Sequence, residues 1–195
     1  MAGLVFACAK PNMVPFGACV GRLNNRPLAV SVPTGRYPPL LLDMTTSVAA
    51  PGKTLVARHG GVPKQEGWGL DLDGRVTTDS NALAPLLPIS SPKGSGMALL
   101  FECFASVMAG NALTQPVLSS MNSDSTGEPR AQAPHADRAA VHNQNSVLAA
   151  INISRFVAVE DYKSHIDLLV DGVKLLPRAN GFDEILMPGE RQERS

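Results

Sequence analysis

The chain has 195 residues, of which 44% are hydrophobic, so it can bury the core of one domain, or of one domain and part of another. Its 17 Lys and Arg balance its 17 Asp and Glu, which excludes the strong positive charge typical of proteins that bind nucleic acid or anionic membranes. We therefore expect a small-molecule partner. Three cysteines without metal-ligand spacing argue against a disulfide framework and for a reducing compartment, the cytoplasm.

Proline and glycine punctuate the first 92 residues, and the short apolar runs between them indicate β-strands. Leu4–Ala9 is the first run, and it is too short for a membrane span. Leu28–Val32 and Leu40–Met44 are joined by a Pro/Gly/Tyr turn that is typical of a hairpin, so we expect antiparallel pairing. Leu55–Ala57 is a further candidate strand, and Asp73–Gly74 predicts a tight turn.

A helix is predicted from Pro92 to Met108, with Ser91 as its N-cap and Pro92 at its first position. Its apolar residues repeat with a period of 3.6 and are expected to form the buried face. They are Met97, Leu100, Phe101, Phe104, Val107 and Met108.

The C-terminal half is predicted to contain one further strand and one further helix. Residues 111–145 are polar and aperiodic, which indicates a lid-like or disordered loop. Val147–Ile153 follows as a strand, and residues 159–176 carry the pattern of an amphipathic helix. The tail is expected to form a short apolar strand with an abrupt turn at Pro188–Gly189. The fold class is therefore α+β, with a mainly antiparallel sheet flanked by helices.

Few motifs point to chemistry. No GxGxxG follows a strand and no P-loop occurs, so a Rossmann dinucleotide site has no support. None of the four histidines has a ligand-spaced neighbour, and we expect no metal site. Lys93 is the strongest candidate, because a cation at a helix N-terminus opposes the macrodipole unless it holds an anion together with uncommitted N–H groups. The residues themselves leave a phosphate site and an ordinary surface lysine equally open.

Five separated segments resemble the malate/L-lactate dehydrogenase-like oxidoreductases in order and spacing, over nearly the whole chain. They are "PNMVPFGACVGRLNNRPLAVSVPTG", "PPLLLDMTTSVAAPGK", "EGWGLDLDGRVTTD", "SPKGSGMALLFECFASVMAG" and "DEILMPGE". The resemblance implies an enzyme that binds NAD or NADP on a non-Rossmann, largely antiparallel sheet. It also implies a homodimer, with no nucleic-acid or membrane partner.

The resemblance also implies roles for particular positions. Asn25 matches a position that contacts substrate, and Lys53 matches a position at the reaction centre. A lysine there would favour negative charge that develops on the substrate oxygen. The positions that match cofactor contacts are Asp43, Met44, Thr45, Pro92, Lys93, Pro188, Gly189 and Glu190.

Two departures from the family pattern affect the expected activity. Asn24-Asn25-Arg26-Pro27 stands where members usually carry Gly-Thr-Asn-Pro, so a bulky cation alters the substrate contact. The family's Ser-His-Gly general acid, in a helical N-terminal region, is missing, so residues 1–195 resemble the NAD(P)-binding, C-terminal part of a member.

The implied function is hydride transfer between nicotinamide and C2 of a 2-hydroxy or 2-oxo acid, such as malate or lactate, or of a cyclic imino acid. The alternative is an inactive, truncated remnant that at most binds a dinucleotide or dimerises.

Overall fold

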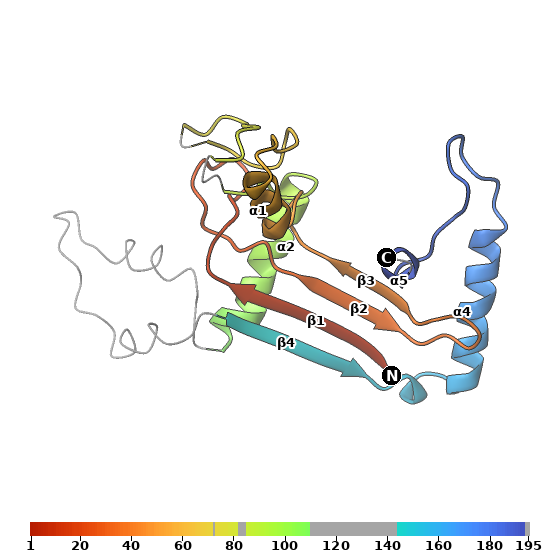
Figure 1. Ribbon diagram of the computed structural model, residues 1–195. Helices are drawn as coiled ribbons and strands as arrows, with labels where there is room; N and C mark the ends of the chain where they lie inside the picture. The colour runs from red at the N-terminus through yellow and green to blue at the C-terminus, as the bar shows by residue number, and fades with distance from the viewer. Residues whose placement is uncertain (72, 82–84, 110–143, 194–195) are drawn as a thin grey trace. The chain divides into compact units, whose positions relative to one another are not determined.

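The computed structural model describes residues 1–71, 73–81, 85–109 and 144–193 (Figure 1). The chain forms two compact units, which are described separately below. Unit 1 comprises Met1–Val5, Leu28–Met44 and Leu148–Ser195, and unit 2 comprises Phe6–Pro27 and Thr45–Val147. The loop predicted at 111–145 lies outside the described residues except at its last two positions, where a strand begins.

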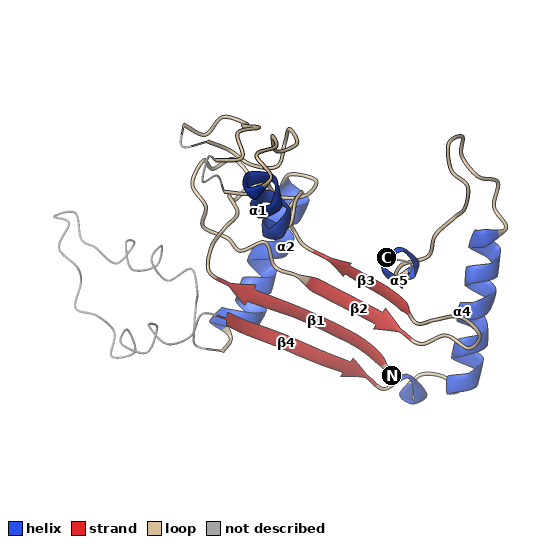
Figure 2. Ribbon diagram, in the orientation of Figure 1, coloured by secondary structure: helices blue, strands red, loops and turns tan. Residues whose placement is uncertain are grey.

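Four strands form one sheet in the order β3-β2-β1-β4, and neighbouring arrows point in opposite directions (Figure 2). The strands are β1 (Ala2–Ala9), β2 (Leu28–Val32), β3 (Leu40–Met44) and β4 (Gln144–Ile151). Leu28 pairs with Met44 and Val32 pairs with Leu40, so the predicted hairpin and its antiparallel register are confirmed. Strand β4 starts three residues before the predicted Val147.

The helices are α1 (Pro51–His59), α2 (Pro92–Glu102), α4 (Val159–Lys174) and the short α5 (Glu190–Glu193). A π-helical turn, η1 (Cys103–Val107), extends α2, and a 3₁₀ turn, η3 (Ile153–Arg155), follows β4. The predicted helices at 92–108 and 159–176 are confirmed. None of the helices in the described part of the chain is long and apolar enough to cross a membrane.

The predicted strand at Leu55–Ala57 is wrong, because these residues belong to α1. Pro51 occupies the start of that helix, where its missing N–H has no intrahelical partner to lose. Arg58 and His59 lie in the last turn, where positive charge favours the helix dipole. A three-residue apolar run could not distinguish a strand from one face of this short helix.

The predicted buried face of α2 is also wrong. The residues that face the protein are small or polar and recur every four positions: Gly94, Ala98, Glu102 and Ser106. Of the predicted apolar residues, Met97 and Phe101 are half-buried, whereas Leu100 is 59% exposed and Phe104 is 52% exposed. Val107 and Met108 are exposed as well. Small residues allow the helix backbone to approach its neighbours closely, which large side chains would prevent.

The tail forms no strand between residues 181 and 193. One main-chain bond, from Leu41 N to the carbonyl oxygen of Pro188 at 3.0 Å, attaches it to β3. Pro188 has no N–H with which to continue a ladder. The predicted turn is confirmed, because Gly189 adopts a φ of 102°, which favours glycine.

The core of unit 2 consists of Met13, Leu23, Ala49, Leu86 and Ala98, with Trp68 packed against it. Ala98 is thereby the part of α2 that enters this core. Nearby on the same helix, the Phe101 ring stacks on Phe6, with ring centroids 4.4 Å apart.

In unit 1, helix α4 holds the turn between β2 and β3. The carboxylate of Asp167 accepts hydrogen bonds from the backbone N–H groups of Gly35 at 3.0 Å and Arg36 at 2.9 Å. One helical turn later, Asp171 accepts hydrogen bonds from the Tyr37 hydroxyl and the Arg36 guanidinium. A Cβ at Gly35 would lie 2.5 Å from the Asp167 carboxylate, so any larger residue would displace that carboxylate.

We predict that Asp171→Asn destabilises the protein near neutral pH but not at low pH. The hydrogen bonds from Tyr37 and Arg36 hold the pKa of Asp171 below its ordinary value. Their stabilising effect is therefore complete above the unfolded-state pKa, about 3.9, and is lost as the pH falls through the lower folded-state pKa. Urea unfolding at several pH values measures the difference between wild type and variant. A difference that stays constant down to pH ~2 would contradict the prediction, and Asp183→Asn is the control.

Candidate functional site

In unit 2, a series of main-chain hydrogen bonds connects three of the segments singled out from the sequence. The carbonyl oxygen of Asn25 accepts from Thr46 N at 2.7 Å, and that of Thr46 accepts from Ile89 N at 2.8 Å. The carbonyl oxygen of Ile89 then accepts from Gly94 N at 2.9 Å. The predicted substrate position Asn25 is thereby tied to the segments that contain the predicted cofactor positions Thr45, Pro92 and Lys93.

Gly94 makes this close arrangement possible. A Cβ at this position would lie 2.5 Å from the carbonyl oxygens of both Ile89 and Thr46. The chain enters α2 through Ser90 and Ser91, whose φ values of 47° and 53° lie in the left-handed region that non-glycine residues seldom adopt. Backbone strain of this kind persists only where the surrounding contacts fix it, and it is common at ligand sites.

The N–H groups at the start of α2 are not free, contrary to the sequence-based interpretation. Lys93 N donates to Ser90 O at 3.3 Å, Gly94 N donates to Ile89 O, and Ser95 N donates to Ser91 O at 3.4 Å. The tight turn that precedes the helix supplies these carbonyl acceptors. An anion at this place would therefore be held by the exposed Lys93 side chain rather than by uncommitted backbone donors.

Lys93 has the properties expected of an anion contact. Its side chain is exposed and makes no hydrogen bond or ion pair with the residues that the structure describes. Helix α2 has no acidic residue in its first turn to balance this charge. The lysine thus opposes the positive end of the helix dipole, and a bound phosphate would relieve that repulsion.

Asn25 is buried and its amide is partly committed. Its side-chain oxygen accepts a hydrogen bond from Asn12 Nδ2 at 2.9 Å, and its backbone N–H donates to Asn12 Oδ1 at 2.8 Å. This reciprocal pair fixes the orientation of both amides. Asn12 in turn lines a cavity, so Asn25 is one hydrogen bond away from that space.

Arg26 does not project toward a ligand, although the sequence predicted that its charge would alter the substrate contact. The side chain is fully buried and forms an ion pair with Glu102 of α2, which is also buried. Arg26 Nε and Nη1 have no hydrogen-bond partner among the described residues. Ser106 also donates a hydrogen bond to the Glu102 carboxylate, at 3.2 Å.

Sequence reasoning missed this ion pair. Glu102 is an acidic residue within an apolar helix, four positions after Ala98 and four before Ser106. That spacing places Glu102 on the same helix face as the small residues. This shared face was the sequence pattern that could have predicted a buried acid. The buried Cys8 thiol lies beside the pair, and burial is the main cause that raises the pKa of this thiol.

In unit 1, one main-chain hydrogen bond connects the two segments that contain the other predicted cofactor residues. Pro188 bonds to Leu41 of β3, and Asp43 and Met44 end that strand. The Glu190 carboxylate is held by Lys174 Nζ at 2.7 Å and by Met187 N at 2.9 Å. Glu190 therefore helps to fix the Pro188–Glu190 turn.

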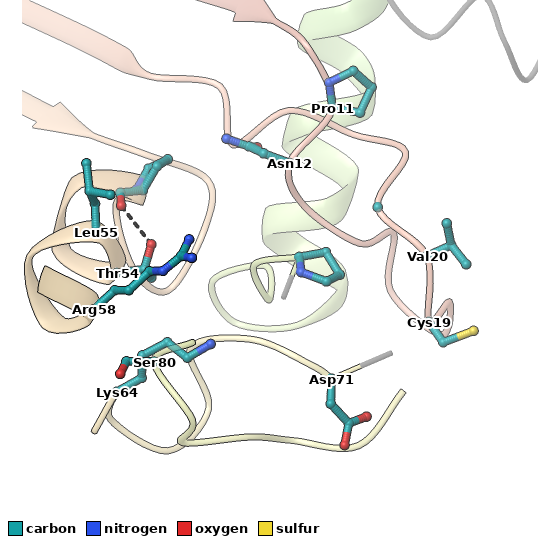
Figure 3. Close-up of a pocket in the computed structure, with 13 residues that line it drawn as sticks. Pro11, Asn12, Cys19, Val20, Thr54, Leu55, Arg58, Lys64, Asp71 and Ser80 are labelled. Atoms are coloured by element: carbon teal, nitrogen blue, oxygen red, sulfur yellow. Dashed lines mark hydrogen bonds between the residues drawn. The ribbon is translucent and has the colours of Figure 1, made fainter. Parts of the chain in front are cut away.

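A cavity of about 690 Å³ opens in unit 2 beside α1 (Figure 3). Its lining from α1 comprises Pro51, Thr54, Leu55 and Arg58. Lys53 lies in the same helix but is not part of the lining. The ammonium of Lys53 is exposed and has no hydrogen bond to the other predicted site residues within the described chain.

Potential metal ligands are not grouped. Among residues 1–71, 73–81, 85–109 and 144–193, no set of three His, Cys, Asp or Glu side chains lies close enough to hold a metal ion.

Comparison with known proteins places this geometry in context. A family described as malate/L-lactate dehydrogenase matches residues 1–195. L-sulfolactate dehydrogenase of Methanocaldococcus jannaschii is 32% identical over 197 residues, which cover 100% of this chain and 52% of that protein. A solved structure of sulfolactate dehydrogenase from this organism has a TM-score of 0.71 at 30% identity, and covers 100% of this chain and 52% of its own.

Other relatives differ in the cofactor that their names state. Ureidoglycolate dehydrogenase (NAD(+)) of Escherichia coli O157:H7 is 30% identical, with 99% of this chain and 51% of that protein covered. (2R)-3-sulfolactate dehydrogenase (NADP(+)) of Chromohalobacter salexigens is 30% identical, with 69% of this chain and 39% of that protein covered. The chain spans about half the length of the first two curated relatives.

We predict that Glu102→Gln lowers the free energy of unfolding by about 3–5 kcal/mol, because it leaves the buried Arg26 cation without a counter-charge. Replacing both residues with methionine should restore most of this loss, since the stems remain packed and no charge is buried. Urea unfolding measures both variants. The control is Glu160→Gln, which breaks an exposed pair with Lys163 and should cost about 1 kcal/mol or less. Equal losses in Glu102→Gln and the control would contradict the prediction.

Proposed function

The chain belongs to the malate/L-lactate dehydrogenase family, and on that premise we propose that it forms the nicotinamide-binding part of an oxidoreductase. In the proposed reaction a hydride moves between C4 of the nicotinamide and C2 of a 2-hydroxy or 2-oxo acid, or of a cyclic imino acid. The cofactor is NAD or NADP, bound without a Rossmann fold, and the working form is a homodimer.

The observation that carries the proposal is the connection of Asn25, the Thr45–Thr46 segment and the start of α2 by three successive hydrogen bonds. A dehydrogenase needs its cofactor and substrate held at a fixed distance, because hydride transfer requires the two reacting carbons to be in contact. Main-chain bonds between a substrate position and a cofactor position supply such rigidity.

Lys93 is proposed to hold the phosphates of the cofactor. Its ammonium is exposed, and it stands on a turn that Gly94 and the strained Ser90 and Ser91 fix in place. A lysine binds phosphate as a point charge, without the directional fork of an arginine. The Asp43–Thr45 segment and the Pro188–Glu190 turn are proposed to contact the remainder of the cofactor through backbone groups.

Asn25 and Lys53 are proposed to act on the substrate. Asn12 fixes the orientation of the Asn25 amide, so this amide can position a substrate oxygen without first losing rotamer freedom. Lys53 is proposed to stabilise negative charge that develops on that oxygen when hydride leaves or arrives at C2.

We predict that the chain binds NADH or NADPH saturably, as followed by nicotinamide fluorescence. Lys93→Ala should weaken this binding about tenfold, because it removes one charged hydrogen bond. Lys10→Ala removes another exposed lysine and should leave the dissociation constant within about twofold. The more tightly bound nucleotide identifies the preferred cofactor. Equal binding by wild type and Lys93→Ala would contradict the role given to this lysine.

We also predict that a protein carrying this chain together with a region that supplies a proton donor oxidises NADH or NADPH in the presence of a 2-oxo or cyclic imino acid. Lys53→Met should lower kcat by about tenfold to a hundredfold while leaving nicotinamide binding intact, because its charge acts on the transition state. The change of nicotinamide absorbance with time measures the turnover rate. Nicotinamide binding without turnover on any such acid would instead support the inactive remnant.

A further inference from the structure

The backbone of unit 2 is strained at Arg26, the residue that follows the proposed substrate contact Asn25. Arg26 adopts a φ of 36°, in the left-handed region that an arginine seldom occupies. The proline that comes next restricts the backbone of Arg26 further. Strain of this kind persists only where the surrounding contacts fix it. The contacts made by Arg26 and its neighbours must therefore account for the turn.

Main-chain groups on both sides of Arg26 are held by hydrogen bonds. Arg26 N donates to Asn24 Oδ1 at 3.1 Å, and Asn24 Nδ2 donates to the carbonyl oxygen of Lys10 at 2.9 Å. After the turn, Ala7 N donates to the carbonyl oxygen of Pro27 at 3.1 Å. The chain is thus fixed before and after Arg26, so the strained φ is a stable part of the fold.

The Arg26 side chain adds a contact with helix α2. Its guanidinium forms an ion pair with the Glu102 carboxylate, and both side chains are buried. The φ of Arg26 is the rotation between the Asn25–Arg26 peptide group and the Arg26 Cα, from which this anchored side chain departs. The ion pair therefore helps to hold the peptide group whose carbonyl belongs to Asn25.

Helix α2 thereby reaches Asn25 by two routes. One is the series of main-chain hydrogen bonds that runs from Gly94 through Ile89 and Thr46 to the Asn25 carbonyl oxygen. The other is the ion pair, which starts at Glu102 and ends on the next residue of the chain. The two starting points lie about two turns, or about 12 Å, apart along one helix. Two separate points on one rigid element thus fix the same peptide group.

Stability alone does not account for the ion pair. Removing two charges from water is costly, and apolar residues of similar size often serve a protein core as well or better. Arg26 Nε and Nη1 also have no hydrogen-bond partner among the described residues, which adds to the cost. What a charged pair supplies instead is direction, because a guanidinium and a carboxylate have a preferred geometry that apolar contacts lack.

We propose that Arg26 and Glu102 are positioning residues that orient Asn25 for its contact with the substrate. The inference rests on the proposed function, in which the Asn25 amide contacts a substrate oxygen. Because both charged side chains are buried, they act through the peptide group of Asn25 and the hydrogen bond that it accepts from Thr46. Loss of the pair should weaken the substrate contact and leave the cofactor contact of Lys93 in place.

Amide hydrogen exchange of the whole chain, followed by NMR, tests the orientation of Asn25 without any ligand. The Thr46 N–H donates to the Asn25 carbonyl oxygen at 2.7 Å, so its exchange rate reports on this peptide group. The Leu87 N–H, which is also hydrogen-bonded within unit 2, is the reference. In Arg26→Met/Glu102→Met we expect the Thr46 N–H to exchange about tenfold faster, and the Leu87 N–H to stay within about twofold of wild type.

Two further variants complete this experiment. Glu160→Met/Lys163→Met makes the same kind of change in an exposed ion pair and should leave the exchange of Thr46 unchanged. Glu102→Asp keeps both charges and shortens one side chain, so it should accelerate Thr46 exchange by at least about twofold, and it replaces the double variant if that variant does not fold. Unchanged exchange of Thr46, or equal acceleration of Thr46 and Leu87, would overturn the proposal.

Binding of oxamate to the chain saturated with NADH tests whether the orientation of Asn25 matters to the substrate. Oxamate is an unreactive isostere of a 2-oxo acid. Arg26→Met/Glu102→Met should bind oxamate about tenfold more weakly and NADH within about twofold of wild type. In an Asn25→Ala background the same double change should cause no further loss, because the pair acts through Asn25. Additive losses, as expected of a merely structural role, would contradict the proposal.

The two measurements distinguish failure of the positioning role from failure of the proposed function. A folded wild-type chain that binds neither NADH nor oxamate refutes the proposed function, and with it the role of the pair toward a substrate. The exchange rate of Thr46 needs no ligand, so it still decides whether Arg26 and Glu102 orient Asn25. Faster Thr46 exchange with unchanged oxamate affinity would refute the link between this orientation and the substrate.

Discussion

The close approach of α2 to the two segments around Thr46 and Ile89 is the constraint on which the rest of unit 2 depends. Gly94 permits it, and Ala98, Glu102 and Ser106 continue the contact along the same face of the helix. A side chain at position 94 would meet the carbonyl oxygens of Thr46 and Ile89, so the helix could not keep the hydrogen bond from Gly94 N to Ile89 O. The most buried face of α2 thus sets the position of the helix, and Leu99, Leu100, Phe104, Val107 and Met108 in α2 and the turns that follow it remain exposed.

The bounds of both hairpin strands were predictable, because two apolar strands with a Pro/Gly turn between them have few other ways to pair. Helix α4 was predictable because sixteen residues supply a long periodic signal with acidic residues at its start and a lysine at its end. Helix α1 and the tail were not predictable, since three or four apolar residues fit a strand and a helix equally well. For α2, periodicity identified the helix but not its buried face, because that choice depended on the close packing of Gly94.

The candidate site was predictable in part. A lysine and glycines at a helix start drew attention to Lys93. The structure shows its side chain exposed on a fixed turn, with no partner among the described residues. The backbone donors expected there are already used, because the carbonyl oxygens of Ser90 and Ile89 accept from Lys93 N and Gly94 N. The sequence could not reveal this, since it depends on left-handed φ values at two serines.

The ion pair between Arg26 and Glu102 has a consequence for how this protein can diverge. A chain that loses one of the two charges keeps the other buried and uncompensated, whereas a chain that loses both keeps a packed interior. The two positions, 76 residues apart in the chain, are therefore expected to change together among descendants of this gene. A lineage that carries arginine at one position should carry an acid at the other. Sequences with only one of the two charges should persist only briefly.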